Sequence, residues 1–228
     1  IDVTAKVLTL SGAGASTTGA LTKAGEGTLT LSGANAYTGA TTVAAGTLRL
    51  GAAERIADGS ALSVAAGATF DMNGNSETVS SVDNAGTVAT GTGVTLATTA
   101  TQKHSGTVIA GNNVTLSAGG EIAATNAAND FQGNVSLAGS AVGVRDANDL
   151  TIVSLTSGSN QAVKLTAGAK LTLPASAINT GTAAMSLESQ GGTLATAGAL
   201  TGGNLFLLGR DGITLGHNLS AGGSLGLA

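Results

Sequence analysis

Two aspartates and an arginine form the cluster of this chain that is best suited to acid–base chemistry. Asp130 and Asp149 each end an Ala-Asn-Asp tripeptide, and Arg145 and Asp146 lie between them. Hydrolysis of a glycosidic bond uses two carboxyl groups about 5 to 10 Å apart. If the chain winds once between the two tripeptides, the aspartates stack at about 5 Å. Such a site would belong to a carbohydrate-active enzyme, either a polysaccharide lyase or a glycosidase.

A structural interpretation competes with this catalytic one. Asn129 and Asn148 repeat at the same spacing as the aspartates and could form a stacked side-chain ladder at a solvated bend. Ligand pockets are rich in aromatic side chains, and Phe131 is the only aromatic residue beside the cluster. We therefore favour the interpretation of this cluster as a solvated bend and expect no catalytic residue. A carbohydrate-active enzyme that uses Asp130, Asp149 and Arg145 stays the alternative function.

The other polar residues indicate no metal or cofactor site. His104 and His217 lie far apart in the sequence without a second ligand at metal-binding spacing, so we expect both on the surface. The chain has no cysteine, which excludes disulfides and thiolate ligands. No calcium-binding nonapeptide and no Walker motif accompanies the glycine clusters. Tyr37 is expected to pack in a bend rather than to contact a ligand.

Composition and charge exclude several classes of protein. Glycine accounts for 36 of the 228 residues, charged residues for only 10%, and the mean hydropathy is positive. Disorder requires low hydrophobicity and high charge, so we expect an ordered chain. The net charge is −4 and the nine Lys and Arg residues are scattered, so nucleic acid is not an expected partner. No run of about 18 apolar residues exists that could form a transmembrane helix.

The elements that would position these residues repeat with a period near 20. Triplets of the type Gly-[Thr/Ala]-[Leu/Val/Thr] begin at Gly27, Gly46, Gly67, Gly86 and Gly106. The inward-facing candidates that follow them are Leu29, Leu48, Phe70, Val88 and Val108. Phe70 comes one residue late, which an insertion at a bend would explain. Related copies continue to 222–227, but the register stays open over 150–191.

Alternation within each copy predicts short strands. In Thr28-Leu29-Thr30-Leu31 the leucines face one side and the threonines the other. Short strands that recur every 20 residues fold economically as a parallel β-helix, an all-β solenoid in which identical positions stack. We expect one continuous β-helix over 1–228, of about eleven coils and about 50 Å in length.

Threonines form a candidate outward file on the same strands. Thr28, Thr47, Thr87 and Thr107 occupy equivalent positions. A flat ice-binding surface needs a second threonine file, and the neighbouring outward positions are Thr30, Arg49, Ala89 and Ile109. We therefore do not expect ice binding.

The segment 25–51, GEGTLTLSGANAYTGATTVAAGTLRLG, resembles the autotransporter-associated β-strand repeat, GxGTLTLSGxNTYTGGTTVxxGTLxLG. It departs from that pattern at Ala36 and Ala40. Residues 129–137 and the later Gly-Gly-x-Leu units resemble filamentous-haemagglutinin-like large exoproteins. On this basis, 1–110 are similar to autotransporter coils and 111–228 to haemagglutinin coils.

Both resemblances imply an exported Gram-negative bacterial protein with a right-handed β-helix, displayed at the outer membrane and extracellular. They imply a structural stalk or adhesin, as an autotransporter or two-partner-secretion passenger. The expected partners are a host or bacterial surface receptor or polysaccharide, adjoining coils of a longer chain, and further copies through end-to-end or side-by-side association. We also expect the segment to be an interior part of that longer chain.

Overall fold

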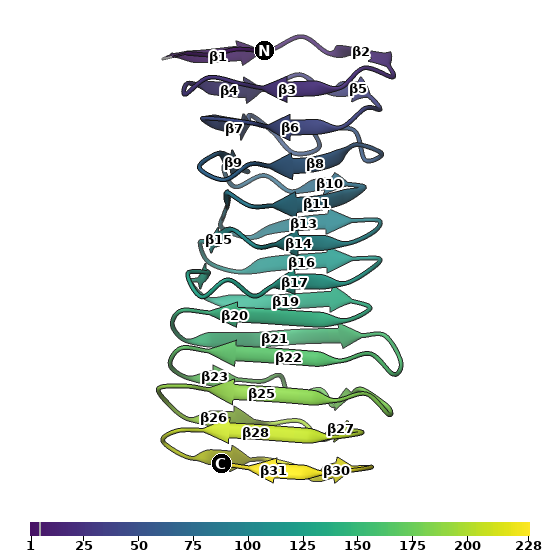
Figure 1. Ribbon diagram of the computed structural model, residues 1–228, viewed down its shortest axis with the longest axis vertical. Helices are drawn as coiled ribbons and strands as arrows, with labels where there is room; N and C mark the ends of the chain where they lie inside the picture. Colours follow the sequence, from purple (N-terminus) through teal and green to yellow (C-terminus); the bar gives the residue numbers. More distant parts are fainter. Residues whose placement is uncertain (5) are drawn as a thin grey trace.

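The computed structural model describes residues 1–4 and 6–228, and in this part of the chain it contains β-strands joined by turns and bends, with no helix. The strands pair in parallel and lie across the long axis of the molecule, with the two termini at opposite ends (Figure 1). Successive coils are about 20 residues apart. The predicted all-β fold, a parallel β-helix with coils of this length, is confirmed.

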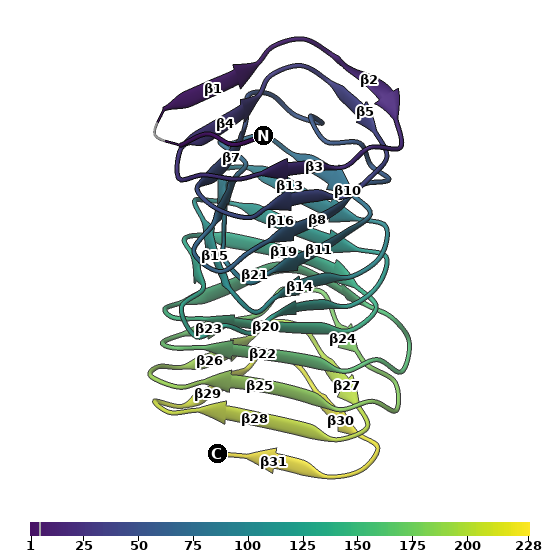
Figure 2. The same cartoon turned by 45° about the horizontal axis from the view of Figure 1, so that its top comes forward.

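Eleven strands form the longest sheet, which we call the long sheet, and it extends almost from one end of the molecule to the other (Figures 1 and 2). Its strands are β3 (Leu21–Lys23), β6 (Thr41–Val43), β8 (Ala61–Val64), β11 (Ser81–Asn84), β14 (Gln102–His104), β17 (Ile122–Ala124), β20 (Val142–Asp146), β22 (Val163–Ala167), β25 (Met185–Ser189), β28 (Leu205–Gly209) and β31 (Leu225–Leu227).

Two further sheets complete most of the coil. The seven-stranded sheet contains β1 (Val7–Leu10), β4 (Thr28–Leu31), β7 (Thr47–Leu50), β9 (Thr69–Asp71), β12 (Thr87–Gly91), β15 (Thr107–Ala110) and β18 (Asp130–Phe131). The eight-stranded sheet contains β10 (Glu77–Val79), β13 (Val94–Thr98), β16 (Val114–Ala118), β19 (Asn134–Gly139), β21 (Leu150–Ser157), β23 (Leu171–Thr172), β26 (Leu194–Thr196) and β29 (Ile213–Leu215).

Two small sheets occupy the ends. One pairs β2 (Gly14–Thr17) with β5 (Asn35–Tyr37), and it flares away from the stack near the N-terminus (Figure 2). The other contains β24 (Ile178–Asn179), β27 (Leu200–Gly202) and β30 (Leu219–Ala221).

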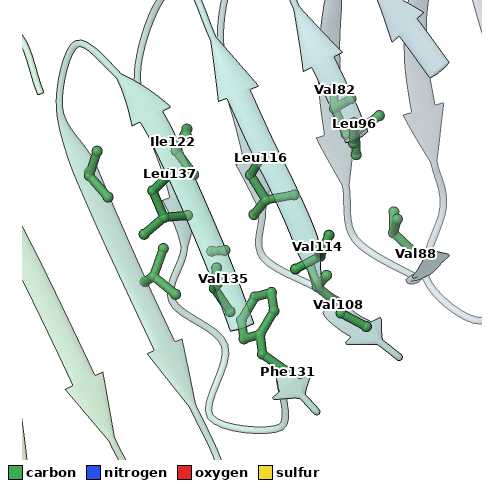
Figure 3. Packing of buried hydrophobic residues seen from close by; sticks show 14 of the residues in the cluster. Val82, Val88, Leu96, Val108, Val114, Leu116, Ile122, Phe131, Val135 and Leu137 are labelled. Atoms are coloured by element: carbon green, nitrogen blue, oxygen red, sulfur yellow. The ribbon is translucent and has the colours of Figure 1, made fainter. Parts of the chain in front are cut away.

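The core consists of apolar files that run along the axis. Leu29, Leu48, Phe70, Val88 and Val108 pair in register and are fully buried, as the sequence predicts. Comparable files enter from the other sheets and meet inside the coil (Figure 3). Burial of each such side chain contributes about 1.5–3 kcal/mol, so stacked coils stabilise one another although a single coil encloses little core.

Glycine has a steric role at the entry to the seven-stranded sheet. A Cβ on Gly46 would lie 2.5 Å from the carbonyl oxygens of Gly25 and Gly27, and one on Gly106 would lie 2.1 Å from the oxygen of Gly86. The coil therefore passes too close to its predecessor for any side chain at these positions. In the coil of Phe70 the corresponding residue is Ala68, because Gly67 and one further residue extend the bend. The predicted insertion is thus present.

Two pairings between residues more than about 20 positions apart define the register over 150–191, which the sequence left open. Val163 pairs with Met185, and Leu171 pairs with Leu194. The additional residues lie in the bend that contains the buried Pro174 and then in β24.

Candidate functional site

The three residues of the alternative enzyme function, Asp130, Asp149 and Arg145, make hydrogen bonds to different partners. The carboxylate of Asp130 accepts hydrogen bonds from Gln132 Nε2 (2.9 Å) and Asn148 Nδ2 (3.3 Å), whereas Asp149 Oδ1 accepts the backbone N–H of Lys170 at 2.9 Å. Arg145 projects from the outer face of β20 and donates to Gln190 Oε1 at 3.3 Å. No ion pair closer than 4 Å links the described Arg145 to either carboxylate.

The prediction of a stacked ladder of Asn129 and Asn148 is wrong. Asn129 is buried, with Oδ1 accepting the N–H of Val108 at 2.8 Å and Nδ2 donating to the oxygens of Ala124 and Arg145. Asn148 is exposed. The two copies of the tripeptide therefore do not occupy equivalent positions in their coils. The asparagine of the first copy faces the interior, and that of the second copy faces the solvent.

Asp146 rather than Asp149 is the buried carboxylate of this region. Its Oδ1 accepts the N–H groups of Phe131 (3.4 Å) and Asn148 (3.3 Å). Burial raises the pKa of Asp146 to about 6, against these backbone hydrogen bonds, which lower it. The residue next to it, Arg145, faces outward, since successive side chains of a strand alternate.

His104 is not a surface residue, which corrects the expectation from the sequence. It is 1% exposed and lies in the interior file of the long sheet between Asn84 and Ala124. Neither ring nitrogen has a hydrogen-bond partner within the described residues, and burial lowers the pKa of His104 to about 4. The alternation of β14 buries Gln102 and His104 and exposes Lys103. His217 is exposed, as expected.

Glu77 is a second buried carboxyl group, which sequence reasoning missed. It is fully buried at the start of the file that continues through Leu96 and Leu116. Burial raises the pKa of Glu77 to about 7, although hydrogen bonds from the N–H groups of Arg55 and Ile56 lower it. Glu77 faces the same side of β10 as the buried Val79, but the two residues show this only once the strand register is known.

Tyr37 is the last residue of β5 and packs beside the bend that follows it, which agrees with the packing role expected from the sequence. It is 8% exposed, and its hydroxyl lies 2.7 Å from Thr41 Oγ1, which in turn lies 2.9 Å from Ser60 Oγ. Ser60 Oγ donates onward to the oxygen of Gly39 at 2.8 Å. This chain of hydroxyl groups fixes the bend.

The threonine file has one more member than the sequence indicated. Thr28, Thr47, Thr69, Thr87 and Thr107 pair in register. The adjacent outward file contains Arg49, whose Nε lies 2.7 Å from Asp71 Oδ2. The second file is therefore charged, and no flat threonine surface forms.

A polar recess lies on the outer face of the long sheet. It has a volume of about 340 Å³ and is lined by Thr125, Val144, Arg145, Lys164, Thr166, Glu188 and Gln190. These residues come from β20, β22 and β25, apart from Thr125, which follows β17, and Gln190, which follows β25. Only Arg145 was singled out from the sequence. Lys164, Glu188 and Gln190 were missed because they fall in 150–191, where the register was open.

Within the described residues no group of three or more histidine, cysteine, aspartate or glutamate side chains could hold a metal ion. A search of that same part for a helix with the length and apolarity to cross a membrane also finds none.

Comparison with known proteins identifies one repeat. Residues 21–50 match the model of the passenger-associated-transport-repeat family. The match covers β3 through β7, including all but the last residue of the resemblance segment 25–51. Searches of curated proteins and of solved structures gave no match. The repeat and the β-solenoid together fit an autotransporter passenger repeat protein.

Proposed function

We propose that the chain is a structural stalk or adhesin segment of an exported bacterial surface protein, and that it works by display or adhesion without catalysis. The observation that carries this proposal is the continuity between the passenger repeat and the rest of the solenoid. β3 and β6 of the repeat belong to the same long sheet as β31, so every later coil continues the stack to which the repeat belongs.

Several features support a mechanical role. Parallel ladders along the axis distribute load over many backbone hydrogen bonds, and the interior files join each coil to its neighbours. The two buried carboxyl groups, Glu77 and Asp146, accept backbone N–H groups and lie inside the coil wall. Residues in such positions stabilise bends and cannot reach a substrate outside.

Surface display tests the proposal. The chain is fused to an outer-membrane transporter in a non-adherent bacterial host, and retention of the cells on mucosal cell layers is measured under flow. We expect retention above that of a host which displays the Leu116→Asp variant, whose core file is broken. Equal retention of both strains, with both chains detected at the surface, would remove the adhesive part of the proposal. Turnover of acidic polysaccharides by the purified chain would remove the non-catalytic part.

A further inference from the structure

One outward file of the long sheet combines two cations with an aromatic ring. In-register pairing places Lys103, Ala123, Gly143, Lys164, Ser186 and Phe206 one above another on six successive strands. The residues between the larger side chains are small. With strands about 4.8 Å apart, Lys103 and Lys164 are separated by about 14 Å and Lys164 and Phe206 by about 10 Å.

The recess lies beside the middle of this file. Arg145, Thr166 and Glu188 form the adjacent outward file, so Arg145 and Lys164 reach the same hollow. Gly143, which pairs with Lys164, has no side chain and therefore leaves space on this part of the outer surface. The guanidinium of Arg145 donates to the neutral Gln190 Oε1, and its Nε is buried without a partner in the described residues.

The two cations of the recess make no close ion pair with its one carboxylate, Glu188. Glu188 Oε1 accepts the hydroxyl of Ser186 at 3.0 Å. In residues 1–4 and 6–228, the ion pair of Arg49 with Asp71 is the only one closer than 4 Å, so neither Arg145 nor Lys164 is paired. A guanidinium with a free N–H favours a planar oxyanion such as a carboxylate, which it binds through two N–H groups.

Phe206 adds an apolar platform to this polar file. It is 42% exposed, whereas the other three aromatic residues, Tyr37, Phe70 and Phe131, are buried. An exposed ring beside hydroxyl, amide and cationic groups is suited to a ligand with apolar faces and carboxylate edges. Sugar rings that carry uronate groups have both. The spacing of the file requires a ligand several units long, because a single sugar would reach only one of its large side chains.

We propose that this face of the long sheet binds an acidic polysaccharide, whose chain runs along the solenoid axis with uronate carboxylates at Arg145 and Lys164 and a sugar ring on Phe206. This proposal deepens the adhesive role proposed above and depends on it for its biological meaning. Binding itself can be measured on the purified chain.

The test uses polygalacturonate as the acidic probe and dextran as the neutral one, with binding followed by affinity electrophoresis. Lys164→Glu reverses a charge in the recess, and Lys170→Glu makes the same change at an exposed position outside this file. Phe206→Ser removes the ring, and Phe206→Tyr restores an aromatic face. Circular dichroism checks that all four variants keep the β-structure.

We expect polygalacturonate to bind and dextran not to bind. Binding should weaken about tenfold or more in Lys164→Glu and Phe206→Ser, and stay near the original in Lys170→Glu and Phe206→Tyr. Equal loss in Lys164→Glu and Lys170→Glu would show unspecific charge attraction and overturn the proposal. Absence of polygalacturonate binding would also overturn it. If displayed Lys164→Glu cells still adhere in full, the acidic-polysaccharide site fails while the adhesin function stands.

Discussion

The carboxylate of Glu77 accepts the backbone N–H of Arg55 at 2.9 Å, across one coil of the stack. Its other oxygen accepts the N–H of Ile56 at 3.1 Å. Glu77 belongs to β10, the first strand of the eight-stranded sheet, so its side chain binds the N–H groups of the coil that precedes the sheet. An acidic residue thus ends a leucine file from within the core, and its protonation is linked to folding.

Folding stability should fall as the pH rises through neutrality because of Glu77. The folded pKa of about 7 lies above the ordinary value of 4.5, so the contribution of this group is complete below about pH 4.5 and is lost as the pH rises through about 7. Between about pH 5 and 8 we expect a loss of about 2–3 kcal/mol from this residue. Urea unfolding over this range should be flatter for Glu77→Gln. An unchanged slope in that variant would contradict the assignment.

His104 should act in the opposite direction. Its folded pKa of about 4 lies below the ordinary 6.5, so its contribution is complete above about pH 6.5 and is lost as the pH falls toward 4. His104→Leu removes this loss, and we expect the variant to gain about 2–3 kcal/mol over the parent when both are taken from about pH 7.5 to about pH 4.5. Other titrating groups cancel in this difference. Parallel pH curves for the two proteins would show that the imidazole is not buried.

The stacked glycines can be tested by a pair of matched substitutions. Gly106→Ala places a Cβ against the oxygen of Gly86, whereas a Cβ on Gly59 meets nothing within 4 Å. We expect Gly106→Ala to destabilise the fold by about 1–3 kcal/mol through overpacking. Gly59→Ala should change the stability by less than about 0.5 kcal/mol. Thermal unfolding of the two variants provides the comparison, and equal midpoints would refute the close approach of the coils.

An inward and an outward apolar residue on neighbouring strands of one coil, Leu116 of β16 and Ile109 of β15, allow a second matched comparison. Leu116 is fully buried and Ile109 is 44% exposed. Leu116→Ala should cost about 2–5 kcal/mol, since it leaves a cavity in a file. Ile109→Ala should cost less than about 0.5 kcal/mol. A large loss at Ile109 would mean that a further surface covers this position.

The sequence predicts the strands and their inward residues where the 20-residue copies are regular. The prediction fails where a coil changes in length or where a polar residue takes an inward position. The file from Leu29 to Val108 follows from alternation and period, and even the displaced Phe70 is assigned correctly. His104 and Glu77 could not be placed inside by residue type, because charged and polar groups are normally exposed. Their burial depends on the strand register.

The candidate site was predictable only in part. Arg145 stands out by its charge, but its relation to Lys164 and Glu188 depends on long steps between β20, β22 and β25. Extra residues in bends carry no periodic signal, so their number per coil cannot be fixed from spacing alone. The division into autotransporter-like coils 1–110 and haemagglutinin-like coils 111–228 stays a prediction.

The register at the recess underlies both the fold and the proposed binding face, and cross-linking measures it directly. The chain has no cysteine, so an introduced pair reports one contact. Lys164 pairs with Ser186, although a uniform step of about 20 residues would place it beside Ala184. Lys164→Cys with Ser186→Cys should form a disulfide readily on mild oxidation, since paired residues lie within the usual Cα separation. Lys164→Cys with Ala184→Cys should stay reduced, and preferential oxidation of that second pair would contradict the stack described here.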